Sequence, residues 1–380
     1  MSRFTLLKSD ALLPVKIAPM VIQPDHRPSR ALERLSAIAV CVSATVLMLT
    51  CLCGHSEAGK KDRVKITLLI ASGVPESMAY HAGMRLASLW TTQLRDLGIR
   101  VSAAASEGSL ENLEALRISD ADVIIVEGLP AELSYHGKGP FKKQPLSKLR
   151  AITALWEESI HVVAASERVS TGTVKDLGGL VVATGLPGST RKLVTDILLK
   201  QVPNSKAGLR AMSDLAAVEA LRRGTVQGLV LFGVVPTRTV SSLFDEPQPA
   251  LALLEIDPAD IAALKQAGWK DVGQQTIPAG AYRGQDKLVK TAGQRNLLAV
   301  SAGVEPAVVY ALTKTLFENL PYFAKLHPAC TDLGLDNAMD GVTVPLHPGA
   351  LRYFTEKRVE IPGDLIAKPP DSEHASGKKK

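Results

Sequence analysis

Three turns in this sequence carry small and hydroxyl residues directly before predicted helices. They span residues 72–77, 106–109 and 185–190. Unpaired backbone N–H groups and the helix dipole favour an anion at a helix start, so three such turns facing one cleft would bind a carboxylate. Each turn taken alone is better explained as a helix cap or a tight turn. Their recurrence at the carboxyl ends of predicted parallel strands, where α/β proteins place ligands, favours a joint binding site.

Signatures of enzymes and metal sites are missing where they would be needed. The turn at 185–189 has the small residues of a nucleophile elbow but not the G-x-S-x-G order, and the sequence has no Walker motif. The eight histidines show no paired metal-ligand spacing. We therefore expect no enzymatic activity, no metal site and no cofactor. An enzyme with Ser189 as nucleophile or Glu127 as base is the weakest alternative, and His161, within an apolar strand, is interpreted as a core histidine.

Strand-like and helix-like segments alternate from residue 64 onward, which is typical of α/β folds with parallel sheets. In the first half we expect strands at 64–71, 100–105 and 122–126, with helices starting near 77 and 109. The second half repeats the pattern. There we expect strands at 151–156, 161–165, 180–184, 227–232 and 251–256, and helices at 188–199, 214–223, 258–267 and 305–320.

An uncharged apolar run at 35–52 predicts an export segment. Three arginines precede the run, and small residues follow it, as in a secretory signal peptide. The run also approaches the roughly 17–25 residues that span a bilayer, so an uncleaved anchor in the inner membrane stays open. Three of the four cysteines lie at 41–53, within the signal peptide or anchor expected at 35–58, and its removal leaves Cys330 as the one thiol of the mature chain. We expect an exported, periplasmic protein.

The overall composition is that of a globular protein and gives little support to a nucleic-acid partner. The 380 residues are 46% hydrophobic and 22% charged, enough for one large core or two medium ones. The net charge of +6 is spread along the chain, and aromatic residues make up only 4%. Nucleic-acid binding needs clustered positive charge beside aromatic or groove-reading elements, so we expect none.

Several motifs in colinear order resemble those of TAXI solute receptors, the substrate-capturing subunits of TRAP-type transporters. They are YHGKGPF at 135–141, HVV at 161–163, IPAGAYRGQD at 277–286, VYALTK at 309–314 and PLHPGA at 345–350. The resemblance implies a two-lobed α/β fold of the type II periplasmic binding proteins, with a ligand cleft between the lobes. It also implies capture of a small organic solute, a carboxylate or an amino-acid-like compound, for a TRAP-type membrane permease.

The sequence departs from that family's pattern at the ligand end. Glu76 and Ser77 occupy glycine positions, only Tyr80 of a tyrosine pair is kept, and Glu127 stands where the family usually has glutamine. The extra carboxylates would oppose a bound anion unless Arg191 or another cation offsets them, so a neutral or amine-bearing ligand is also compatible. Glu127 would then reject dicarboxylates, unless it points to solvent. The candidate ligand-binding residues are Ser77, Tyr80, Ser109, Glu127, Gly188, Ser189, Thr190 and Arg191.

The expected domain organisation follows from these segments. Residues 1–34 precede the signal peptide or anchor at 35–58, lobe one comprises 63–156 plus 287–356, lobe two comprises 157–286, and 357–380 form a disordered tail. A membrane-anchored ligand sensor on the same fold is the alternative to a transport receptor.

Overall fold

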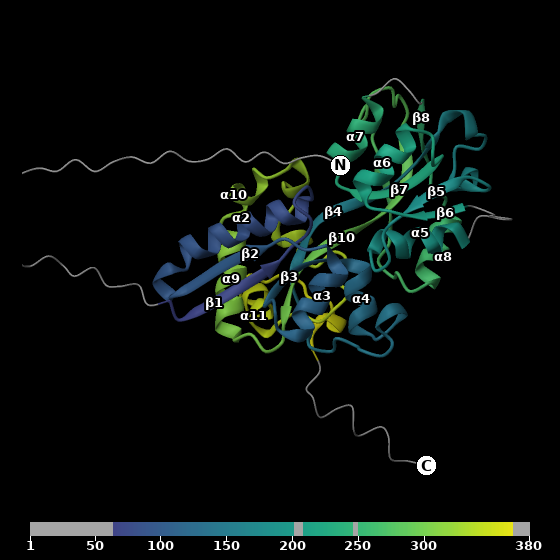
Figure 1. Cartoon of the computed structure of the whole chain (residues 1–380). Coiled ribbons are helices and arrows are strands. Elements are labelled where there is room, and N and C mark those ends of the chain that lie inside the picture. Colours follow the sequence, from purple (N-terminus) through teal and green to yellow (C-terminus); the bar gives the residue numbers. More distant parts are fainter. Residues whose placement is uncertain (1–63, 201–207, 246–249, 368–380) are drawn as a thin grey trace, which may run out of the picture. The chain divides into compact units, whose positions relative to one another are not determined.

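The computed structural model describes residues 64–200, 208–245 and 250–367 (Figure 1). The chain divides into two compact units, Met1–Lys61 and Asp62–Lys380, and only the second contains described residues. The predicted export segment at 35–58 lies outside them. Within the described ranges, no helix combines the length and apolar character needed to cross a membrane.

The described residues form one ten-stranded sheet flanked by helices. Its strand order is β2-β1-β3-β10-β4-β7-β5-β6, with β8 paired to β4 and β9 paired to β10. The strands are β1 (Ile66–Ala71), β2 (Ile99–Ala104), β3 (Val123–Glu127), β4 (Leu149–Ala165), β5 (Val181–Thr184), β6 (Gly208–Ala211), β7 (Gly228–Gly233), β8 (Leu251–Leu254), β9 (Gly273–Ile277) and β10 (Val289–Ser301).

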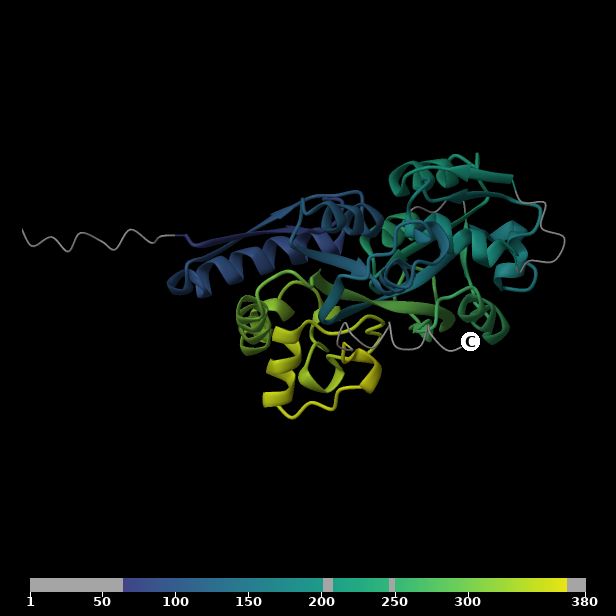
Figure 2. The same ribbon diagram turned by 90° about the horizontal axis from the view of Figure 1, so that it is seen from below.

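The α-helices of the described ranges connect these strands or cover them. They are α2 (Met78–Gln93), α3 (Ser109–Ile118), α4 (Gly128–Tyr135), α5 (Thr190–Lys200), α6 (Asp214–Arg222), α7 (Arg238–Phe244), α8 (Pro258–Gln266), α9 (Pro306–Glu318), α10 (Leu320–Ala324) and α11 (Pro348–Glu356). Figure 2 shows the last part of the chain, coloured green to yellow, gathered on one side of the first strands. The indole Nε1–H of Trp90 on α2 donates to the Leu312 carbonyl on α9 at 3.0 Å and joins the two helices.

The central strands differ from the expected parallel arrangement. β10 is antiparallel to both β3 and β4, and β4 is one continuous strand of 17 residues where two separate strands were expected. The polar pair Glu157-Glu158 makes the sequence of β4 look interrupted, but both residues lie within its hydrogen-bonded ladder with β10. The prediction of purely parallel sheets was therefore wrong at the centre, while β1, β2 and β3 pair in parallel as expected.

The hydrophobic core falls into groups that share the long strands β4 and β10. One group packs β1–β3, α2, α9 and α11 around buried residues such as Trp90 and Trp156. Two further groups pack the part of the chain from β5 to β9, around Trp269 and around Tyr282. Leu129 and Leu133 of α4 belong to the second of these three groups. The expected α/β class is confirmed.

The chain after α11 is ordered as far as it is described. Residues 357–367 return to the first core group, where Leu365 is 3% exposed and its carbonyl accepts a hydrogen bond from the Leu346 N–H at 2.8 Å. Part of the expected tail at 357–380 is thus packed, because Leu365 is buried in the core and Val359 and Ile361 pack against it. Residues 368–380 lie outside the described residues.

Candidate functional site

Glu127 ends β3 and joins the amino-terminal ends of two helices. Ser109, the first residue of α3, accepts a hydrogen bond at Oγ from the Glu127 backbone N–H at 3.0 Å. Thr190, the first residue of α5, donates its hydroxyl to Glu127 Oε2. Two of the three predicted turns therefore meet at Glu127, which contacts two of the other candidate residues.

A row of polar side chains continues from Glu127 across the centre of the sheet. In the strand register Asn296 of β10 lies opposite Glu127, and Gln294 lies opposite Glu158 of β4. Directly opposed residues, and residues two apart in one strand, lie on the same face of a sheet. Glu127, Asn296, Gln294 and Glu158 therefore share one face.

The two amides of this row are buried and incompletely hydrogen-bonded. Gln294 and Asn296 are each 3% exposed. The Gln294 Oε1 atom accepts from the Leu129 N–H at 2.9 Å, but its Nε2 has no partner among the described residues. The Asn296 amide lies close enough to Glu158 to lower the pKa of that carboxyl, yet its Nδ2 makes no well-aligned hydrogen bond within the described ranges. An unsatisfied buried N–H group is costly, so each amide has a free donor to offer.

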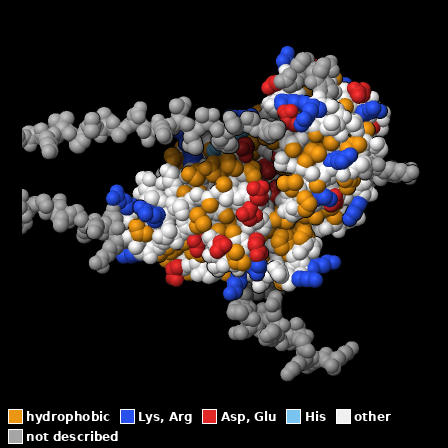
Figure 3. All heavy atoms as spheres, in the orientation of Figure 1, with side chains coloured by type: hydrophobic (Ala, Val, Ile, Leu, Met, Phe, Trp, Pro, Cys, Tyr) orange, Lys and Arg blue, Asp and Glu red, His pale blue; other side chains and the backbone are white. Residues whose placement is uncertain are grey.

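Both carboxyls of the row have raised pKa values. Burial, and next the charge of Glu127, raise the pKa of Glu158 to about 7, although the Trp156 Nε1–H donates to Glu158 Oε1 at 3.1 Å. Burial is also the largest cause that raises the pKa of Glu127, and the charge of Asp214 adds to it, against the hydrogen bonds from Ser109 and Thr190. Both glutamates keep some solvent exposure. In Figure 3, Asp and Glu side chains gather in a hollow over the region of β4 and β10.

Arg191, the candidate cation of the site, is engaged elsewhere. Its Nε lies 3.0 Å from Asp214 Oδ1, and its guanidinium also donates to the carbonyls of Met212 and Val230. The residue is 6% exposed. Its positive charge is thus paired with Asp214 at the start of α6, and Arg191 forms no ion pair with Glu127 or Glu158 in the described structure.

The other four candidate residues lie at helix starts without joining Glu127 in any contact recorded for the described chain. Ser77 Oγ donates to the Val74 carbonyl at 2.7 Å and accepts from the Tyr80 N–H at 3.1 Å, which caps α2. Ser189 Oγ donates to the Leu186 carbonyl at 2.8 Å and accepts from the Lys192 N–H at 3.2 Å, which caps the first turn of α5. Two candidates remain, Gly188 with a φ of +86° and Tyr80, which is partly exposed and packs edge-on against His81.

The site also contains residues that the sequence analysis missed. These are Glu158, Gln294, Asn296 and Asp214. A partial signal was present at Glu157 and Glu158, which interrupt an apolar-rich stretch, whereas the sequence around Gln294 and Asn296 gave none. A polar residue inside a buried strand has a desolvation cost that a ligand or a hydrogen bond must offset.

His161 is part of a buried hydrogen-bond chain and not of the polar row. It is fully buried, its Nδ1 lies 3.1 Å from the Ser159 carbonyl and its Nε2 lies 2.8 Å from the Tyr282 hydroxyl. The carbonyl can only accept, so Nδ1 carries the proton and Nε2 accepts from Tyr282. The Tyr282 oxygen in turn accepts from the Thr237 N–H at 3.0 Å. Burial lowers the pKa of His161 to about 4, which keeps it neutral at pH 7.

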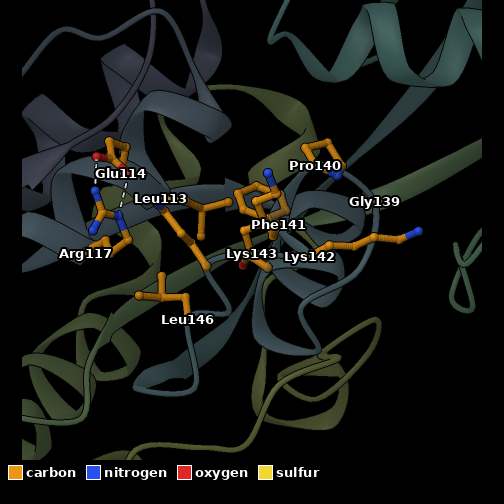
Figure 4. Close-up of a pocket in the computed structure, with 11 residues that line it drawn as sticks. Leu113, Glu114, Arg117, Gly139, Pro140, Phe141, Lys142, Lys143 and Leu146 are labelled. Carbon is orange, nitrogen blue, oxygen red and sulfur yellow. Dashed lines mark hydrogen bonds and ion pairs between the residues drawn. The ribbon is translucent and has the colours of Figure 1, made fainter.

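A separate pocket of about 590 Å³ lies between α3 and the loop after α4 (Figure 4). Its apolar lining includes Leu113, Phe141 and Leu146, and Arg117 at its rim is paired with Glu114 at 2.7 Å. None of the eight candidate residues lines it. The predicted site and this pocket are therefore distinct features of the molecule.

Solved structures with similar folds include several binding proteins. A protein from Xanthomonas citri bound to ATP is 16% identical, with a TM-score of 0.46, and the match covers 77% of this chain and 98% of that one. PhnD1 from Prochlorococcus marinus in complex with methylphosphonate is 13% identical, with a TM-score of 0.45, and the match covers 70% of this chain and 90% of that one. An ancestral arginine-binding protein bound to arginine is 13% identical, with a TM-score of 0.43, and the match covers 70% of this chain and 98% of that one. Similarity at this level says nothing about the ligand of this chain.

The family relationship rests on the sequence itself. Residues 70–357 match the model of the NMT1-like family, a span that runs from β1 through α11 and includes every residue of the polar row. Because the match covers well over half of the 380 residues, the chain belongs to the NMT1-like family.

Proposed function

We propose that this protein is an exported receptor that captures a small organic solute, a carboxylate or an amino-acid-like compound, and delivers it to a TRAP-type membrane permease. The family match supports a binding receptor, and the sequence motifs that resemble TAXI receptors are the basis for the TRAP permease. In this proposal the segment at 35–58 directs export, and the mature protein works in the periplasm. In the alternative form of the proposal, the segment stays uncleaved and anchors the protein in the inner membrane.

The observation that carries the proposal is the meeting of α3 and α5 at Glu127. Ser109 and Thr190 present hydroxyl groups at two helix starts, where the helix dipole favours a polar or negative group. In the described structure the Thr190 hydroxyl donates to the Glu127 carboxylate, and the Ser109 hydroxyl accepts from the Glu127 backbone N–H. A ligand beside Glu127 would take over or share these hydroxyl groups.

We also propose two lobes with the bounds expected from the sequence, 63–156 plus 287–356 and 157–286. The division of the hydrophobic core supports this, because one core group contains the first three strands and the last helices, and the other two contain β5–β9. Glu127 would belong to lobe one and Thr190 to lobe two, so their hydrogen bond would bridge the lobes. Ligand binding at such a bridge is compatible with hinge closure around β4 and β10.

A thermal-shift screen of organic acids, amino acids and amines tests the proposed function. A compound that binds only the folded protein raises its melting temperature with concentration. The hydroxyl-deletion variant Thr190→Val should weaken the binding of any hit by about 1–3 kcal/mol, the usual cost of an unpaired buried polar group. Thr276→Val, at an exposed position of β9, is the matched control and should leave affinity unchanged. A screen in which no compound shifts the melting temperature contradicts the proposal.

A further inference from the structure

The polar row on the central strands has an unusual chemical composition for a site that would hold an anion. It presents two carboxylates, Glu127 and Glu158, with the two amides of Gln294 and Asn296 between them. Among the ion pairs of the described residues, none involves either glutamate. When these carboxyls ionise, no cation of the described chain forms an ion pair with them.

The strand geometry leaves space between the two carboxylates. Glu127 and Glu158 lie on β3 and β4, which pair with opposite edges of β10. Two strand spacings separate their backbones by about 10 Å, and the register offsets them by two residues, or about 7 Å along the strands. Each glutamate side chain spans only part of that separation. The carboxylates are nevertheless near enough for the charge of Glu127 to act on Glu158, so a cationic group held between them would interact with both.

The amides provide an observation that is independent of the acidic residues. The Nε2 of Gln294 and the Nδ2 of Asn296 are buried, and neither has a well-aligned hydrogen bond within the described ranges. Both project from β10 on the face shared with the two glutamates. They require acceptors, which a ligand oxygen would supply.

We infer that the recess between Glu127 and Glu158 binds the ammonium or guanidinium group of a small organic cation that also carries an oxygen acceptor for the amides of Gln294 and Asn296. This inference rests on the proposed function and narrows its solute class to amine-bearing compounds. The cationic end offsets the repulsion between the two carboxylates, which a dicarboxylate would increase. Arg191 does not reverse this preference, because Asp214 neutralises it.

Calorimetric titration of the purified protein with cationic and acidic probes tests the inference. The cationic probes are agmatine, putrescine and L-arginine, and the acidic probes are succinate and 2-oxoglutarate. We expect at least one cationic probe to bind, and to bind more tightly than either acid. Glu158→Gln and Glu127→Gln should each lower that affinity by roughly 10- to 100-fold, as expected for the loss of a charge-assisted hydrogen bond.

Glu360→Gln is the control, since Glu360 is exposed and lies outside the polar row. It should leave the affinity for the cationic probe unchanged, and the unliganded melting temperatures of all three variants verify that each is folded. If the acids bind and the cations do not, the inference is overturned while the proposed function stands. If no probe of either class binds, both are overturned. Cation binding that is equal in the parent and in both glutamine variants also refutes the assigned site.

Discussion

Replacing Glu158 by glutamine should change how the stability of the protein depends on pH. The pKa of Glu158 is raised from 4.5 to about 7, first by burial and then by the charge of Glu127. Between these two pH values the unfolded chain has released this proton and the folded chain has kept it. The free energy of unfolding therefore decreases as the pH rises through this window. The protonated Glu158 carboxyl contributes this stability fully below its pKa in the unfolded chain. The contribution is lost above its pKa in the folded chain.

The size of the effect follows from the width of that window. A pKa difference corresponds to about 1.4 kcal/mol per pH unit, so the full window gives about 3 kcal/mol. The side chain keeps some contact with water, which reduces the loss, and we expect about 2 kcal/mol to be measurable. Glutamine preserves the shape and can still accept the Trp156 Nε1–H bond, but it does not ionise.

Urea unfolding of the parent protein and of Glu158→Gln at pH 5 and pH 8 measures this effect. The variant should gain about 2 kcal/mol relative to the parent between the two pH values, because the parent alone loses stability when Glu158 ionises. Glu360→Gln, at an exposed position, should follow the parent at both pH values. A stability difference between Glu158→Gln and the parent that is the same at pH 5 and pH 8 would refute the account of a buried, charge-coupled carboxyl.

Further predictions concern binding and the local structure. If Glu127 faces the ligand, Glu127→Gln should raise the affinity for succinate, and this gain should shrink as salt is added, which titration at two ionic strengths would measure; identical succinate affinities at low salt would contradict it. The affinity for a cationic probe should rise between pH 6 and pH 8 as Glu158 ionises, beside Glu127, whose pKa burial also raises, and the Asp214–Arg191 ion pair; a flat profile would contradict the assigned role. Ser189→Ala should lower the free energy of unfolding by about 0.5–2 kcal/mol because it removes a helix cap, and an unchanged urea midpoint would argue against the cap. Tyr282→Phe should cost about 1–3 kcal/mol, since it leaves the His161 Nε2 and the Thr237 N–H unpaired, and denaturation that matches the parent would show that water replaces the hydroxyl.

Much of the fold was predictable because local patterns and packing agree in the outer strands. β1, β2 and β3 are short apolar runs bounded by small residues, and the helices after β1 and β2 begin close to the positions expected. β10 was missed, since its first half, VKTAGQR, lacks both clear alternation and a continuous apolar run. Its stability comes from pairing with β3, β4 and β9, a tertiary effect that its own sequence does not encode.

The candidate site was only partly accessible to sequence reasoning, for a related reason. Ser109 and Thr190 were found from the turn chemistry of helix starts, and Glu127 from its departure from a family pattern. Glu158 and Asn296 carry no local signal of a common site, because they are 138 residues apart in the chain and are brought together only by the β4–β10 register. Arg191 illustrates the opposite error. Its type and its place beside the turn made it a candidate for ligand binding, but its guanidinium is paired with Asp214 on the next helix.

A crystal structure of the protein with the cationic probe that binds most tightly would test the central claim most directly. The account predicts electron density for the ammonium or guanidinium group within hydrogen-bonding distance of the Glu127 and Glu158 carboxylates, with a ligand oxygen near the amides of Gln294 or Asn296. Density found only in the separate pocket lined by Leu113, Phe141 and Leu146 would contradict it.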